Sequence, residues 1–180
     1  ARSAQGEQKE KTISRYLTLV DKAQVNAVRK YQLLRDALEL NPSDAQVNKI
    51  LSALRTTNTV QALNVAANYL GSSTCYRAAA EAVRGIISSN GALNGGADIK
   101  NALQKAVEAF SKDKANGDAD AGYAIDDVNG LLSKTTATGF TLGSGTATLA
   151  AGSAPASLNK DYENFQITVD FKGSGKATAT

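Results

Sequence analysis

Apolar residues recur at steps of three and four along most of this 180-residue chain, and this spacing constrains the fold more than any other feature of the sequence. Such steps return to the same face of an α-helix, so each series marks one amphipathic helix with its apolar stripe facing a core. We expect one helix of about 30 residues over 11–40. Only Gln24 breaks its stripe, whose members are Ile13, Leu17, Val20, Ala27, Tyr31, Leu34 and Leu38.

The same spacing predicts five shorter helices downstream. The first begins after Pro42, where Ser43 and Gln46 have the spacing of a capping box. The second ends near Gly71, because glycine is common at helix C-caps. The other three are expected over residues 74–88, 98–112 and 120–134. With only six Tyr and four Phe, the core must be filled by Ala, Leu, Val and Ile, which favours packed helices.

The sequence changes character at Thr135, after which Thr, Gly, Ser and Ala dominate. We expect a small antiparallel sheet or hairpin there, with a disordered tail as the alternative. The fold class is therefore mainly α: an antiparallel helical bundle over 1–134 and a β-type C-terminal extension over 135–180. The clearest strand pattern has one apolar face made by Phe165, Ile167, Val169 and Phe171.

The side chains that most enzymes use near neutral pH are scarce. The chain has no His, which excludes an imidazole base, a Ser-His-Asp triad and the ordinary zinc or haem ligand sets. Its single Cys is Cys75, and no two carboxylates stand out as an acid/base pair. We therefore expect no enzyme activity, no cofactor, and no catalytic, cofactor-binding or metal-binding residues.

The stretch around Cys75 is similar to the bilin-attachment stretch of phycobiliproteins, through the spacing Cys75-x-Arg77. The Asp that usually follows the Arg is Ala78 here, so we assign no bilin. A thiol near a helix start and an Arg can be reactive. A buried or half-buried structural Cys is the interpretation we adopt.

An acidic loop after residue 115 has part of the pattern of a calcium-binding EF-hand. The Gly required at its sixth position is Ala121, and the final Glu is replaced by a shorter Asp, so a capped turn between helices is the better interpretation. The residues at ligand positions would be Asn116, Asp118, Asp120 and Asp127.

Basic residues are concentrated near the N-terminus. Residues 1–40 hold eight of the 20 basic side chains and five of the 17 acidic ones, within a net charge of +3. We predict partner binding through Arg29, Lys30 and Arg35, with a solvated helix face as the alternative. Nucleic acid is not expected, because the basic residues are not grouped with stacking aromatics. No apolar stretch approaches the roughly 20 residues that span a bilayer, so any membrane contact would be peripheral and through a partner.

An Ala-rich, His-poor bundle with long amphipathic helices and a basic first helix, over about residues 10–134, resembles the PsbQ-type extrinsic proteins of photosystem II. Basic linker polypeptides of phycobilisomes are a second comparison. The resemblance carries over no functional residues. It implies a structural subunit that docks on a larger photosynthetic complex, a photosystem or phycobilisome, in the chloroplast at the thylakoid.

The chain begins with Ala1 and lacks Met, so we expect a processed product. A second hypothesis belongs to a different class: a secreted or surface-exposed bacterial binding module, located outside the cell or on its surface. The Thr, Gly and Ser-rich extension would suit that alternative.

Overall fold

The computed structural model describes residues 2–137, with side chains from Gly6 onward. All of them belong to the first of two units into which the chain divides, Ala1–Ser144. This part is mainly helical, as expected, and has no strand, whereas the predicted C-terminal hairpin lies outside the described residues. The helices are α1 (Arg2–Lys22), α2 (Ala27–Glu39), α3 (Asp44–Leu54), α4 (Val60–Asn68), α5 (Tyr76–Ser89), the short 3-10 helix η1 (Gly91–Leu93), α6 (Ala97–Ala115) and α7 (Ala121–Leu132).

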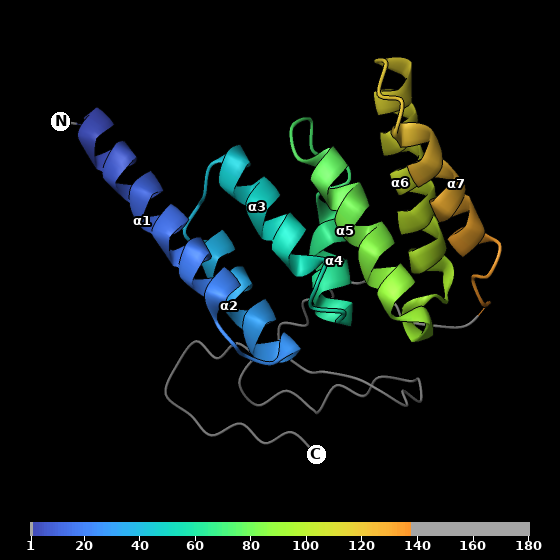
Figure 1. Ribbon diagram of the computed structural model, residues 1–180, viewed down its shortest axis with the longest axis horizontal. Helices are drawn as coiled ribbons and strands as arrows, with labels where there is room; N and C mark the ends of the chain where they lie inside the picture. The colour runs from blue at the N-terminus through green and yellow to red at the C-terminus, as the bar shows by residue number, and fades with distance from the viewer. Residues whose placement is uncertain (1, 138–180) are drawn as a thin grey trace, which may run out of the picture. The chain divides into compact units, whose positions relative to one another are not determined.

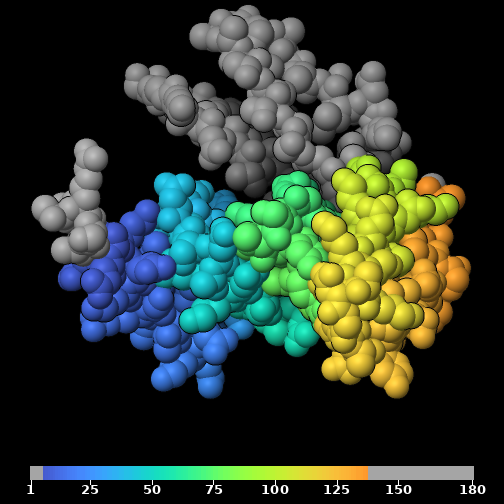
Figure 2. Space-filling view, turned by 90° about the horizontal axis from the view of Figure 1, so that it is seen from above, coloured from blue at the N-terminus to red at the C-terminus, as the bar shows by residue number. Residues whose placement is uncertain are grey.

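The helices are arranged in chain order within this unit (Figure 1). The α1–α2 pair packs on α3, which also contacts α4 and α5, and α6 lies between α5 and α7. Figure 2 shows the same order on the surface, from α1 and α2 in blue to α7 in orange. Because each helix contacts mainly its neighbours in the chain, the unit resembles a stack of helix pairs. None of these helices combines the length and apolarity that a membrane crossing requires.

The prediction of one long helix over 11–40 is wrong. The chain forms two helices, with a break at residues 23–26, and Asn26 caps the second by accepting a hydrogen bond from the backbone N–H of Arg29 at 2.8 Å. This reversal lets both halves of the apolar stripe reach α3, which a single straight helix would not allow. The hydroxyl of Tyr16 also donates to the carbonyl of Leu33 across the hairpin at 3.1 Å.

The helix starts and ends downstream agree better with the sequence. The capping box at Ser43 and Gln46 is present, and Gln46 Oε1 accepts from the Ser43 backbone N–H at 3.1 Å. The expected cap at Gly71 is wrong, because Tyr69 is the C-cap of α4. The last three helices are α5, α6 and α7, each within three residues of its expected ends.

The interior forms one continuous hydrophobic cluster that extends through α1–α7. α5 is its central element and buries six apolar side chains along one face. Its alanines allow close approach of α3, α4 and α6, all of which contact it. Those buried side chains are Ala79, Ala80, Ala82, Val83, Ile86 and Ile87.

Candidate functional site

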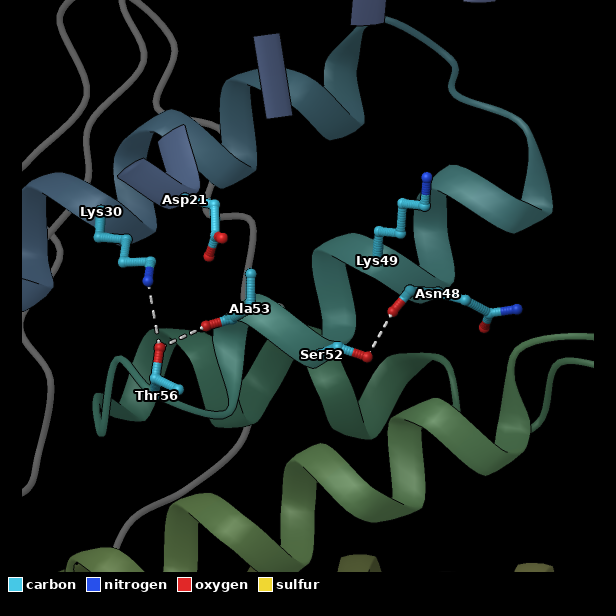
Figure 3. Close-up of a pocket in the computed structure, with 7 residues that line it drawn as sticks. All are labelled: Asp21, Lys30, Asn48, Lys49, Ser52, Ala53 and Thr56. Carbon is cyan, nitrogen blue, oxygen red and sulfur yellow. Dashed lines mark hydrogen bonds between the residues drawn. The ribbon is translucent and has the colours of Figure 1, made fainter. Parts of the chain in front are cut away.

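An open hollow of about 390 Å³ lies where α1, α2 and α3 meet (Figure 3). Asp21 comes from the end of α1 and Lys30 from the first turns of α2, and both reach toward α3. The remaining lining residues belong to α3 and the turn that follows it. They are Asn48, Lys49, Ser52, Ala53 and Thr56.

The polar groups of this hollow are held by local hydrogen bonds. Lys30 Nζ lies 3.4 Å from Thr56 Oγ1, which donates to the carbonyl of Ala53 at 2.9 Å. The Ser52 hydroxyl donates to the carbonyl of Asn48 at 2.9 Å, as Figure 3 shows. The wall is therefore held by local hydrogen bonds, while the ammonium of Lys30 has one long hydrogen bond, to Thr56, among the described residues.

A second hollow, also about 390 Å³, lies on the other side of the same helix, between α3 and α5. It shares Asn48 and Ser52 with the first hollow, so the two adjoin across α3. We call the two together the α3 groove. The second hollow is lined by Asn48, Ser52, Arg55, Thr74, Arg77, Ala78 and Glu81.

The pattern of α3 explains why these polar side chains share one face. Val47, Ile50, Leu51 and Leu54 are buried, and at 100° per residue they occupy one side of the helix. Asn48, Lys49, Ser52 and Arg55 are left on the other side. Because α3 packs on its neighbours along the buried side, its polar side stays at the surface and forms the floor of the groove.

The groove carries more positive than negative charge. Its lining holds four cations and two carboxylates. Arg77 and Glu81 are committed to ion pairs, but Lys30, Lys49 and Arg55 have no ion-pair partner among the described residues. The floor also holds an unsatisfied acceptor, since Asn48 Oδ1 is shielded from solvent and accepts no hydrogen bond from a described residue.

Only one of the three residues predicted to bind a partner lies in this groove. Arg29, Lys30 and Arg35 all belong to α2, but Lys30 and Arg35 point about 100° and 240° away from Arg29 around the helix. The structure therefore does not bring them onto one face. It brings Lys30 beside Lys49 in the first hollow instead, while Arg55 lines the second.

The other two predicted residues are engaged within α2. Arg29 is exposed and its Nη1 donates to Gln32 Oε1 at 3.2 Å. Arg35 is half-buried and forms ion pairs with Asp36 at 3.3 Å and Glu39 at 3.8 Å. Binding of a partner through these three residues stays a prediction.

Lys49 and Arg55 were missed in the sequence because the basic excess was sought near the N-terminus. The signal that could have identified them is the polar face of α3, which is the complement of its apolar stripe. That face adjoins α2 only because the chain reverses at residues 23–26.

Arg77 joins two motifs that lie far apart in the sequence. Its Nη1 donates to Asp113 Oδ2 and to Asp118 Oδ2, both at 2.6 Å, and its guanidinium lies 5.3 Å from the centre of the Phe110 ring. The Tyr76 hydroxyl donates to Asp113 at 2.5 Å, and this bond raises the pKa of Tyr76. The arrangement fixes the start of α5 to the end of α6.

The acidic residues in and after this loop form a hydrogen bond within the turn and ion pairs. Asp118 Oδ1 accepts from the backbone N–H of Asp120 at 2.9 Å, and Arg84 donates to Asp127 at 2.6 Å. The hydrogen bond from Arg77, helped by that backbone N–H, lowers the pKa of Asp118. Within the described residues, no three His, Cys, Asp or Glu side chains gather as a metal site would require.

Cys75 is the N-cap residue of α5 and only 2% of it is exposed. Its sulfur lies 3.8 Å from the backbone carbonyl of Asp44 at the start of α3. The expectation of a buried Cys is confirmed.

No family model, curated protein or solved structure matches this chain.

Proposed function

We propose that this chain is a non-enzymatic structural subunit that docks on a larger protein assembly. The observation that carries the proposal is the α3 groove: an open surface lined mainly by polar and charged residues, with three cations that lack ion-pair partners among the described residues. Small-molecule sites are usually concave enough to enclose most of their ligand and are lined mainly by apolar side chains. An open groove on a stack of helices, lined mainly by polar and charged residues, suits an extended protein surface better.

The kind of assembly follows from the resemblance to PsbQ-type extrinsic proteins. It supports a photosynthetic complex at the thylakoid, reached from the surface through a protein partner. The alternative is a secreted or cell-surface binding module, which the Thr, Gly and Ser-rich segment after residue 134 supports.

The size of the native particle that contains the chain shows whether the chain docks on an assembly or remains alone. A tagged copy of the full chain, expressed in its source cells and separated by native electrophoresis, should migrate in a complex far larger than its own 18.7 kDa. Quantitative mass spectrometry of that complex should find at least one other subunit in a fixed ratio to the chain. Migration as the free chain, with no subunit in a fixed ratio, would contradict the proposal.

A further inference from the structure

We propose that the α3 groove binds an acidic, extended segment of the partner protein. This inference rests on the proposed docking function and names the site and the chemistry of the partner. The groove has three cations without described ion-pair partners, a polar floor and an unsatisfied buried acceptor. The cations match the acidic side chains of a peptide, and the polar floor with its acceptor matches the peptide backbone.

The spacing of the cations suits side chains on an extended strand. Lys49 and Arg55 are six residues apart on α3, which places their Cα atoms about 9 Å apart along the helix axis and about 120° apart around it. Lys49 lines the first hollow and Arg55 the second, so a bound segment would cross α3 to reach both. Acidic residues two or three positions apart on an extended chain are separated by about 7–10 Å. Lys30 adds a third positive charge on the α2 side of the groove.

The floor supplies hydrogen-bond partners for a peptide backbone. Asn48 lines both hollows, and its shielded Oδ1 would accept from a backbone N–H of the bound segment. Ser52 lines both hollows as well, and it is exposed. The two side chains lie one helical turn apart, so one short segment can contact both.

A nucleic acid fits the groove less well. Its lining contains no aromatic side chain on which a base could stack. Three cations without ion-pair partners in the described part of the chain also give a weaker field than nucleic-acid sites that neutralise many phosphates. Three cations are enough to neutralise a few acidic side chains at fixed positions.

The test compares two variants that each remove two positive charges. Lys49→Gln with Arg55→Gln alters the groove, whereas Arg29→Gln with Arg35→Gln alters the rest of the basic set on α2. The probe is a fluorescein-labelled peptide of alternating Glu and Ala, titrated at low salt and read by fluorescence anisotropy. We expect the groove variant to bind about tenfold more weakly and the α2 variant to bind within about twofold of the parent.

A steric variant keeps the test independent of charge. Ser52 is exposed, so Ser52→Phe should leave the fold intact while blocking both hollows and weakening peptide binding. Ser111→Phe, at an exposed position on α6, is the matched control and should bind like the parent. Circular dichroism of each variant verifies that the helices are retained.

Three results would overturn the inference. These are no peptide binding by the parent chain, equal losses in the two charge variants, or tighter binding of a single-stranded oligonucleotide than of the peptide. None of them bears on whether the chain belongs to a large native complex, so the proposed function can survive them. Conversely, if the chain migrates alone but binds the peptide, the groove remains a binding site for acidic segments and the proposed docking on a larger assembly is contradicted.

Discussion

The two ends of the described unit are held together in different ways. The α1–α2 pair is attached by a thin apolar seam, in which the buried side chains of α2 are only Leu34 and Ala37. At the other end, α5, α6 and α7 bury many more side chains and are joined by ion pairs of Arg77 and Arg84. Fewer buried contacts mean a lower free energy of local opening, so we expect the α1–α2 pair to open more readily.

A polar clasp adds to the difference at the C-terminal end. The buried Asn94 donates from Nδ2 to the carbonyl of Leu131 and accepts from Thr135 Oγ1, each at 2.9 Å. Its backbone carbonyl also accepts from the N–H of Thr136 at 3.3 Å. The segment after α7 is thereby tied to the loop before α6, whereas the α1–α2 hairpin is crossed by the hydrogen bond from Tyr16 to the carbonyl of Leu33 described above.

The largest effect is expected in the core of the α5–α7 end. Phe110 is fully buried, and Phe110→Ala should lower the free energy of unfolding by about 3–5 kcal/mol through lost burial and the cavity left behind. Leu17→Ala in α1, where the side chain is 8% exposed, should cost less. Urea unfolding followed by circular dichroism measures both. Equal losses in the free energy of unfolding would mean that the cores of the two ends are packed equally well.

The second-largest loss of stability is expected from the hydrogen bonds that link Gln46 of α3 to α1. Gln46 Nε2 donates to the carbonyl of Glu10 at 2.8 Å and to Ser14 Oγ at 3.0 Å. Gln46→Ala should cost about 1–3 kcal/mol, because it removes the hydrogen bonds of a buried side chain and half of a capping box. Hydrogen exchange should accelerate in α1 while α6 stays protected. Gln104→Ala, at an exposed position on α6, is the control and should change neither.

A smaller effect is expected where α3 meets α5. A Cβ added at Gly85 would overlap the Cγ and Cδ of Arg55, so glycine at this helical position makes room for that side chain. With Arg55→Ala already present, Gly85→Ala should stabilise the protein by about 0.5–1 kcal/mol, the usual gain of Ala over Gly in a helix. In the parent the gain should be smaller. A double-mutant cycle gives the coupling, and a coupling of zero would mean that Arg55 does not lie on Gly85.

The smallest effect is expected in the dependence of stability on pH. Because the pKa of Asp118 is lowered in the folded state, its ionised form contributes stability above its ordinary pKa, and this contribution is lost as pH falls through the folded value. Asp118→Asn should therefore lower the melting temperature at pH 7, and the difference from the parent should vanish in strong acid. Asp126→Asn, at an exposed position, is the control. A difference that persists at low pH would indicate a steric cause.

Local patterns in the sequence were enough to predict α3, α5, α6 and α7, and the capping box at Ser43. They failed at residues 23–26, because an apolar stripe with steps of three and four is the same for one straight helix and for two helices that fold back. The interruption at Gln24 and the capping residue Asn26 were the only local signs of the break.

The amino-acid sequence by itself determined which residues form helices and which face of each helix is apolar, because both depend on neighbours within four residues. The tertiary structure alone decided the reversal after Lys22, the pairing of Arg77 with Asp113 and Asp118, and the meeting of Lys30 with α3. The two carboxylates lie 36 and 41 residues from Arg77 in the sequence. Such contacts depend on how helices pack, and packing is a property of the whole core that no local window contains.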